Sequence, residues 1–520
     1  MKAYHGTIIS CDKNNTIYQY LVEDLGRIVF VGNELPKQYE NAQIFNLGKR
    51  ALIPSFGESH LHLAAFATFE AGLDIRDANT IYAIKDAISS YSMLHKDKVI
   101  IGFGISPHSI KEKRLLLKED IDHVCPNRPV FIVKYDGHAA VLNTKMIENL
   151  PKKLTKLRGF DKNTGIMKQE AFFAITDYVT SSVSVFKMLD NLVHAIDLLA
   201  NQGIGMIHSS AGVGFLFDLD VDLERFLSKG LFNPFQIRVF FQTMNVDKVI
   251  KRKLPRIGGC FETALDGCFG TEDAALHIPY SNNQSNKGIL FYSDKQVFDF
   301  NRRANKAGLQ IALHAIGDAA FDQAVTAIED CLKDNYRDDH RHTIIHASLP
   351  TEEGLKKCLD LGITIATQPA LLRWKLEPYE YLANILDSRV NFFSPLRQMV
   401  DQGIVISGGS DAPCTYPDPI YGMYAACNHF NPESSVSIED ALKMFTYNVA
   451  WASFDEKERG SLEKGKIADM VILNQNPLQM NKKNLLNLKV EQLYLNGNKY
   501  LPGQGLFNFL MNFMKKSIFS

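Results

Sequence analysis

Eight short apolar segments between residues 51 and 409 constrain the fold of this chain more than any other feature. They are Ala51–Phe56, Gly205–Ser210, Gln236–Gln242, Gly258–Ala264, Gln310–Ile316, Thr343–Ser348, Ile363–Gln368 and Ile404–Gly409. Amphipathic helical patterns separate most of them, for example Gln296–Ala307, Ala319–Leu332 and Glu352–Leu361. Strands that alternate with helices are typical of parallel α/β folds, and eight such units predict a (β/α)8 TIM barrel.

Strand-like segments also lie outside these eight units, at both ends of the chain. They are Thr7–Ser10, Ile17–Leu21 and Arg27–Gly32 at one end, and Ile467–Leu473 and Val490–Gly497 at the other. Neither set is large enough to form a stable sheet alone. We therefore predict that residues 1–52 and 456–505 meet in one small, discontinuous β-sandwich domain, with the barrel over residues 53–455.

The first two predicted barrel strands are separated by far more residues than one connecting helix needs. Residues 66–185 are therefore predicted to form an inserted subdomain, which has strand signals of its own at Val99–Gly104 and Pro129–Lys134. The tail over residues 506–520 is apolar and carries two lysines. We expect this tail to pack on a subunit or partner surface rather than in lipid, which would suit a homo-oligomer.

Composition narrows the partners and the compartment. The chain has 57 basic and 58 acidic side chains, so neither nucleic acid nor an anionic membrane is expected as its main partner. We expect no signal peptide and no membrane span, because no apolar run is long enough for either. The eight cysteines are scattered and form no C-x-x-C motif, which favours reduced thiols in a cytoplasmic protein.

Histidines and carboxylates stand at or just beyond the ends of five predicted strands, where barrels of this kind carry their functional residues. His60 and His62 follow the first strand, and side chains at positions i and i+2 of an extended segment can point to one metal ion. The other four are Glu262, His314, His346 and Asp411. Any one of them could be a core or capping residue, but the joint pattern is hard to explain in that way.

Two residues keep a structural alternative. Asp411 could cap the helix that follows it. The segment Asp136–His138 could be a simple tight turn, or it could carry His138 over the barrel mouth to bind substrate. Further candidates that could equally be structural are His208, Asp266, Asp318, Arg373 and Trp374.

The constellation resembles the amidohydrolase superfamily and, within it, the branch of metal-dependent hydrolases called amidohydrolase family 3. The resemblance covers nearly the whole chain. The segments that carry it are Pro54–His62, Asp136–His138, Ala264–Gly267, His314–Asp318, Ser410–Pro413 and Gly460–Val471.

The resemblance implies roles for the matching positions. His60 and His62 would hold the more buried metal, and His314 and His346 a second or shared one. Asp411 would ligate metal and take a proton from the attacking water. Many relatives carry a carboxylated lysine at the bridging position of the fourth strand, where we place Glu262 as the bridge. Glu58, where relatives usually have aspartate, would act without touching the metal.

These roles predict a hydrolase with one or two divalent metals, most simply Zn²⁺. It would cleave a C–N bond of a small-molecule amide, formamide or cyclic amide by a metal-activated water, with Asp411 as general base. Two alternatives remain at this stage. One is a metal-dependent deaminase of a nitrogen heterocycle, and the other is a non-catalytic protein that keeps the barrel as a scaffold.

Overall fold

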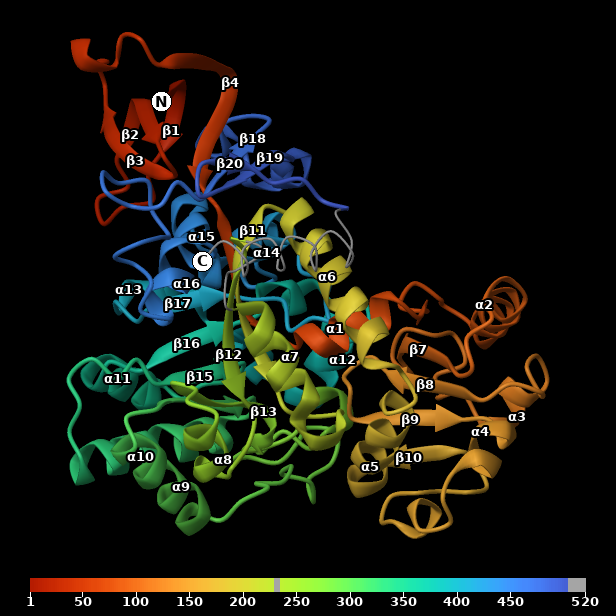
Figure 1. Cartoon of the computed structure of the whole chain (residues 1–520). Coiled ribbons are helices and arrows are strands. Elements are labelled where there is room, and N and C mark those ends of the chain that lie inside the picture. The colour runs from red at the N-terminus through yellow and green to blue at the C-terminus, as the bar shows by residue number, and fades with distance from the viewer. Residues whose placement is uncertain (229–233, 504–520) are drawn as a thin grey trace.

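A barrel occupies the centre of the molecule, with two smaller β-rich parts attached to it (Figure 1). The computed structural model describes residues 1–228 and 234–503, so the predicted apolar tail over 506–520 lies outside the described residues. Within the described ranges, none of the helices combines the length and the apolar character needed to cross a membrane.

The barrel consists of eight parallel strands in the order β17-β16-β15-β14-β13-β12-β11-β5, which confirms the predicted architecture. Their bounds are β5 (Phe56–Leu61), β11 (Ile204–Ala211), β12 (Gln236–Phe241), β13 (Arg256–Ala264), β14 (Gln310–Ala315), β15 (Thr343–His346), β16 (Thr364–Thr367) and β17 (Ile406–Gly408). The two ends of this row meet just beyond β17, where the Asp411 amide donates to the His60 carbonyl at 2.9 Å. The His62 amide likewise donates to the Ala412 carbonyl at 2.8 Å.

The first barrel strand begins later than the sequence suggested. Most of the predicted strand Ala51–Phe56 belongs instead to β4 (Gln43–Pro54), whose last four residues pair with β18 of the terminal sheet. The chain passes from β4 through Ser55 into β5, which pairs with β11 inside the barrel. One continuous apolar run therefore serves two sheets, and periodicity alone cannot divide it.

Helices surround the barrel. They are α1 (Leu63–Glu70), α6 (Val185–Asn201), α7 (Leu219–Ser228), α8 (Val246–Lys251), α9 (Asp294–Lys306), α10 (Asp318–Asp334), α11 (Glu352–Leu361), α12 (Tyr379–Leu386), α13 (Leu396–Asp401), α14 (Pro419–Cys427), α15 (Ile438–Met444) and α16 (Tyr447–Ala452). The α11 bounds match the prediction because both ends carry strong local signals. The Thr351 side chain accepts from the Gly354 amide, and Gly362 ends the helix in the left-handed conformation.

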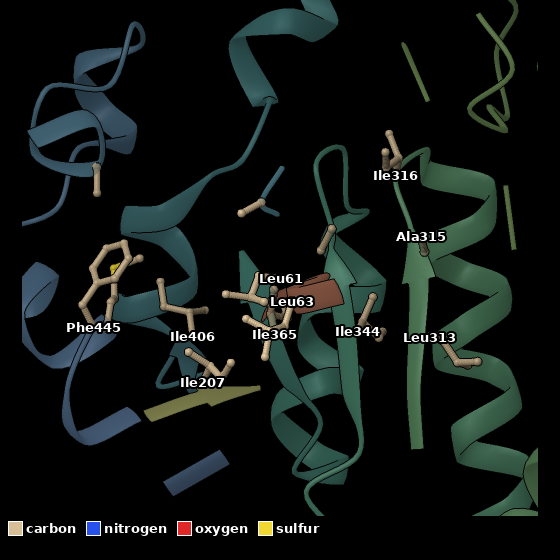
Figure 2. Packing of buried hydrophobic residues seen from close by; sticks show 14 of the residues in the cluster. Leu61, Leu63, Ile207, Leu313, Ala315, Ile316, Ile344, Ile365, Ile406 and Phe445 are labelled. Carbon is tan, nitrogen blue, oxygen red and sulfur yellow. The ribbon is translucent and has the colours of Figure 1, made fainter. Parts of the chain in front are cut away.

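Alternation along the strands separates a core side from a site side. Leu313 and Ala315 of β14 belong to the main apolar core, together with Ile344, Ile365 and Ile406 of the next three strands (Figure 2). Ala312 instead packs inside the barrel with Phe240, Cys260, Ile345 and Ala366. Because His314 lies two residues after Ala312, the pleat points its ring to the inside as well.

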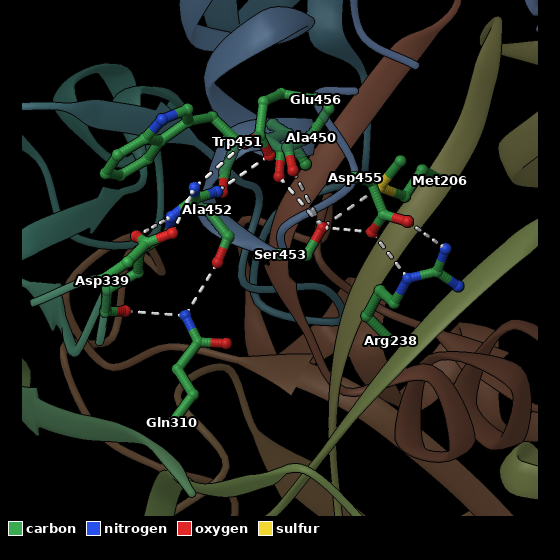
Figure 3. A network of polar contacts seen from close by, with 12 residues as sticks. Met206, Arg238, Gln310, Asp339, Ala450, Trp451, Ala452, Ser453, Asp455 and Glu456 are labelled. Atoms are coloured by element: carbon green, nitrogen blue, oxygen red, sulfur yellow. Dashed lines mark hydrogen bonds and ion pairs between the residues drawn. The ribbon is translucent and has the colours of Figure 1, made fainter. Parts of the chain in front are cut away.

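Polar side chains close the end of the barrel at which the strands begin (Figure 3). Arg238 of β12 forms a bidentate ion pair with Asp455, at 2.6 and 2.7 Å. The Gln310 amide donates to the carbonyls of Arg341 and Ala452, both at 2.7 Å. The segment after α16 is thereby fixed beneath the barrel, so the opposite end is the one left open for a site.

The two ends of the chain meet, as predicted for the small β-sandwich domain, and their strands form one seven-stranded sheet with the order β20-β19-β18-β4-β1-β2-β3. Its strands are β1 (Lys2–Ile9), β2 (Ile17–Asp24), β3 (Arg27–Gly32), β4 (Gln43–Pro54), β18 (Met470–Leu473), β19 (Val490–Leu495) and β20 (Asn498–Lys499). The edge strand β3 also bonds the segment that leads to β18, where the Ile28 amide donates to the Lys466 carbonyl at 2.8 Å. The sheet therefore curls around its own apolar core.

The insert between α1 and α6 has a five-stranded sheet in the order β10-β9-β8-β7-β6. Its elements are β6 (Leu73–Asp74), α2 (Ile81–Leu94), β7 (Ile100–Ile105), α3 (Lys118–Asp122), β8 (Val130–Lys134), β9 (Ala139–Leu142), α4 (Thr144–Asn149), β10 (Ile166–Lys168) and α5 (Gln169–Thr180). Two apolar clusters of its own, one around Ile84 and Ile132 and one around Phe131 and Phe172, hold it together. Figure 1 shows it in orange beside the barrel.

Candidate metal centre

His60, His62 and Asp411 meet at the seam where the barrel closes. The Nε2 atoms of His60 and His62 lie 3.2 and 3.3 Å from Oδ1 of Asp411. His60 comes from β5, His62 directly follows that strand, and Asp411 follows β17. The backbone bonds that close the barrel also hold these three residues together, so the fold itself sets their spacing.

Cys260 of β13 joins this group. Its Sγ lies 3.2 Å from Nε2 of His60 and 3.9 Å from Nε2 of His346. Two sets of potential ligand atoms result, and the atoms within each set lie within 4.8 Å of one another. The first set is His60, His62, Cys260 and Asp411, and the second is Cys260, His314 and His346. Cys260 is the member common to both.

Neighbouring polar groups orient the ligand rings. Nδ1 of His62 donates to the Ser210 carbonyl at 3.3 Å, which turns its Nε2 toward Asp411. Nδ1 of His60 lies 3.3 Å from the Ser210 hydroxyl. Nδ1 of His314 lies 3.5 Å from Oδ1 of Asp266 but makes no hydrogen bond within the described chain. Such outer contacts commonly fix the tautomer and the direction of a metal-ligating histidine.

Two buried carboxylates shape the backbone around the site without joining either ligand set. Asp266 accepts from the amides of Ala275, Ile316 and Gly317 at 2.8–3.0 Å. Glu58 accepts from the His60 and Ser410 amides at 2.9 and 3.0 Å, and so ties β5 to the segment that follows β17. Burial raises the pKa of Asp266 to about 7 and that of Glu58 to about 8.

The protonation states of these side chains favour the binding of a cation. Burial lowers the pKa of His60, lowers that of His314 to about 3, and lowers that of His346 well below its usual range. These rings are therefore neutral and keep lone pairs to donate. Burial raises the pKa of the Cys260 thiol well above its ordinary value, so the thiol needs a nearby cation in order to ionise.

Burial would also raise the pKa of Asp411, but contacts with His60 and His62 hold it well below the usual range. Asp411 is therefore an ionised carboxylate within the group. A carboxylate that faces two imidazoles in this way can bind a metal or hold a proton.

Glu262, the predicted bridging ligand, is not brought to this centre. Its side chain is exposed, and it belongs to neither ligand set. The β13 ladder explains the difference, because Gly259 pairs with Leu313 and Ala264 with His314, so residues 260–263 bulge out of register. Phe261 is in the left-handed region at φ 47°. Inside this bulge Cys260, and not Glu262, faces the centre.

Left-handed backbone recurs at the strand ends of the site. His346, Ala347 and Asp411 have φ values of 71°, 48° and 57°. Such conformations cost about 1–3 kcal/mol each in residues other than glycine and tend to cluster at functional sites. At His346 the turn also ends the regular pleat of β15, so its ring reaches the centre even though it directly follows the inward-facing Ile345.

A large cavity opens above the ligand sets, between the barrel mouth and the insert. His62, Cys260, His314, His346 and Asp411 contribute to its walls. His138 lines it as well, in the turn between β8 and β9, where its amide donates to Asp136 at 3.2 Å. The segment Asp136–His138 is therefore a tight turn, and it also carries His138 to the wall of the cavity.

Of the remaining candidates from the sequence, some line this cavity and others lie away from it. Trp374 lines the cavity. His208 instead shares a small cavity within the barrel with Ser210 and Thr343, and it belongs to neither ligand set. The Asp318 carboxylate accepts from the His277 amide, and the Arg373 guanidinium donates to the Asn428 carbonyl. The last two side chains therefore have hydrogen-bond partners outside both ligand sets.

The donor atoms fit a divalent metal ion. Imidazole nitrogen, thiolate sulfur and carboxylate oxygen are the ligands that Zn²⁺ takes in proteins. Two atoms bound to one tetrahedral Zn²⁺ lie roughly 3.3–3.8 Å apart by the usual bond lengths, which is close to the spacings here. Within the described chain, no lysine or arginine lines the cavity, so only a bound cation or protons would balance Asp411 and an ionised Cys260.

Known proteins resemble this chain over nearly its full length. The model of the amidohydrolase family matches residues 43–499. The Bacillus subtilis (strain 168) protein YtcJ is 26% identical over 96% of this chain and 99% of its own length. The N-substituted formamide deformylase of Arthrobacter pascens is 23% identical over 95% of this chain and 96% of its own.

Solved structures give the same result. The crystal structure of a metal-dependent hydrolase from Pyrococcus horikoshii OT3 superposes with a TM-score of 0.75 and 25% identity. The alignment covers 92% of this chain and 99% of that one. A metal-dependent hydrolase from Pyrococcus furiosus superposes with a TM-score of 0.73 and 25% identity, over 92% of this chain and 100% of that one.

Proposed function

This chain belongs to the amidohydrolase family, and from that premise we propose that it hydrolyses a C–N bond of a small-molecule amide, formamide or cyclic amide at a zinc centre. The observation that carries the proposal is the meeting of two ligand sets at Cys260, in the wall of a cavity that the insert also lines. A scaffold protein would have no need to keep neutral imidazoles, a thiol and a carboxylate together.

His60, His62, Cys260 and Asp411 would hold one Zn²⁺, and Cys260, His314 and His346 a second one. Cys260 takes the bridging role first assigned to Glu262, because a thiolate can bridge two cations and Cys260 belongs to both sets. When bound, the metal would lower the pKa of a water molecule and polarise the substrate carbonyl.

The residues of the chain would handle the protons. The Asp411 carboxylate would accept one proton from the attacking water and deliver it to the leaving nitrogen. In the overall reaction a C–O bond forms and the C–N bond breaks, so an amide and water give a carboxylic acid and an amine. His138, which faces the same cavity from the insert, would donate an N–H to the substrate carbonyl oxygen and orient it.

The formamide deformylase among the relatives makes N-substituted formamides the first substrates to test. We would measure metal content by mass spectrometry and screen N-formyl amines, N-acyl amines, hydantoin-like rings and aminopyrimidines for turnover. We expect one or two zinc ions per chain and hydrolysis that a chelator stops and added zinc restores.

The products of the screen decide between the candidate reactions. Release of an acid together with an amine supports the proposal. Ammonia released without an acid would establish the deaminase instead. A zinc-free preparation that takes up no metal and turns over none of these compounds would leave the barrel as a scaffold.

A further inference from the structure

The cavity above the candidate metal centre is lined largely by aromatic and aliphatic side chains. It contains about 1360 Å³ of empty space, counted out to its open mouth. The insert contributes Phe103, Phe131, Phe172 and Phe173, and the barrel side contributes Phe261 and Trp374. Two separate parts of the fold thus supply apolar walls to one space, which is how binding sites for apolar small molecules are built.

An aromatic path leads from the metal ligands to the insert. The Phe261 ring lies 5.1 Å from that of His62 and 5.7 Å from that of Phe173. Phe173 in turn lies 5.3 Å from Phe172 on the same helix. A group attached next to the scissile bond would therefore meet ring faces and edges as it extends away from the metals.

The ionisable groups among the described lining residues of this cavity are carboxyl groups, thiols and histidines. The carboxylates of Asp136, Glu377 and Asp411 face it, whereas none of its described lining residues is a lysine or an arginine. Lys134 lies close by, but its ammonium is 2.5 Å from Asp136, and both side chains are at least nine-tenths buried. Beyond the metals, an anionic substituent would find no free cation in these walls and would lose its hydration.

We infer that the substrate carries a large, uncharged hydrocarbon or aromatic group beside the scissile C–N bond, and that the site rejects compounds with a carboxylate there. This inference rests on the proposed hydrolysis and specifies its substrate class. N-formyl and N-acyl derivatives of lipophilic amines fit this description. N-acyl amino acids and small polar rings do not.

The kinetic test uses two compounds that differ by one carboxylate, N-formyl-2-phenylethylamine and N-formylphenylalanine. We expect kcat/KM to be at least about 100-fold higher for the uncharged compound, because the charge must be buried without a partner. In the series from N-methylformamide to N-hexylformamide, kcat/KM should rise about fourfold per methylene. The inference would be overturned if both compounds had the same kcat/KM, or if kcat/KM did not change along the alkyl series.

A binding measurement separates this inference from the proposed function. If formamides are not hydrolysed, the same two compounds are titrated into zinc-loaded wild-type protein, with Trp374 fluorescence as the signal. Trp374→Phe serves as the control for the origin of that signal. Saturable binding of the uncharged compound alone would support the substrate class even though the proposed reaction had failed. Equal binding of both compounds, or of neither, would refute it.

A charge introduced into the wall gives a third and independent test. Phe173→Arg places a cation in the cavity. It should lower the ratio of kcat/KM between the uncharged and the charged compound by at least about tenfold. Phe186→Arg is the matched control, because Phe186 is 73% exposed on α6 and lies outside the cavity lining. An unchanged preference in Phe173→Arg would mean that these walls do not select the substrate.

Discussion

The two ends of the barrel both bury polar side chains, but they arrange them in opposite ways. Where the strands begin, charges are matched, as in Arg238 with Asp455 and Arg341 with Asp339 and Glu456 (Figure 3). Where the strands end, imidazoles, a thiol and one carboxylate face one another. In the described part of the chain, Nδ1 of the buried His346 has no hydrogen-bond partner.

The difference distinguishes a lower cluster, where the strands begin, from an upper cluster, where the strands end and the candidate ligands lie. In the lower cluster, each ion-pair or hydrogen-bonding group named here has a partner within the chain, so the cluster needs no ligand to satisfy it. In the upper cluster, His346 and Asp411 have left-handed backbone and place lone pairs beside one another. This arrangement lowers the stability of the fold unless a cation binds there. Changes at the upper end should therefore affect turnover and metal content, and changes at the lower end should affect folding.

Asp411→Asn should give the largest effect, at the upper end. We expect kcat to fall by ~10²-fold or more, with metal content largely retained, because an amide can still coordinate a metal but cannot accept the proton. Steady-state kinetics and metal analysis on the same preparation check this. Retention of more than about a tenth of wild-type kcat would contradict the general-base role.

Asp455→Asn probes the lower end and should act on stability alone. It leaves Arg238 without its ion-pair partner, and we expect about 2 kcal/mol less free energy of unfolding in urea. Asp299→Asn is the control, because the Lys295–Asp299 pair is solvent-exposed and should contribute little to the free energy of unfolding. Loss of metal at 25 °C in folded Asp455→Asn would show that the two ends are not independent.

His138→Ala, also at the upper end, should lower turnover less than Asp411→Asn does. We expect kcat/KM to fall by a factor that corresponds to ~1–3 kcal/mol of lost transition-state binding, with metal content unchanged. His123→Ala, at an exposed position of the same insert, should leave both unaltered. Loss of metal from His138→Ala would make His138 a ligand, and unchanged kinetics would reduce it to a turn residue.

The sequence predicted the barrel well because its signals are local. Strand and helix periodicity gave seven of the eight barrel strands to within a few residues, and histidines two residues apart or at strand ends indicated the ligand pairs. The first strand was misplaced because Ala51–Pro54 is equally apolar in the terminal sheet. The pattern of apolar residues indicates which residues are buried, but it does not indicate which sheet a residue joins.

The placement of Cys260, which we propose as the bridging ligand, could not be obtained in this way. Gly258 and Gly259 both have positive φ, and residues 260–263 leave the ladder, so the alternation that would identify inward-facing side chains is lost. A carboxylate looked the better bridge, and Cys260 was one of several scattered thiols. The two glycines directly before Cys260 were the available sign of a bulge. The aromatic cavity was also hidden, because its walls come from segments that only the fold brings together.

Metal content of three proteins tests the central claim most directly. We predict that wild-type protein and Glu262→Gln bind the same number of zinc ions, whereas Cys260→Ala binds about one fewer, because Cys260 is common to both ligand sets. In the cobalt-substituted wild type, a thiolate-to-cobalt charge-transfer band should appear, and it should be absent from Cys260→Ala. Full metal content in Cys260→Ala, together with loss of an ion in Glu262→Gln, would contradict the account.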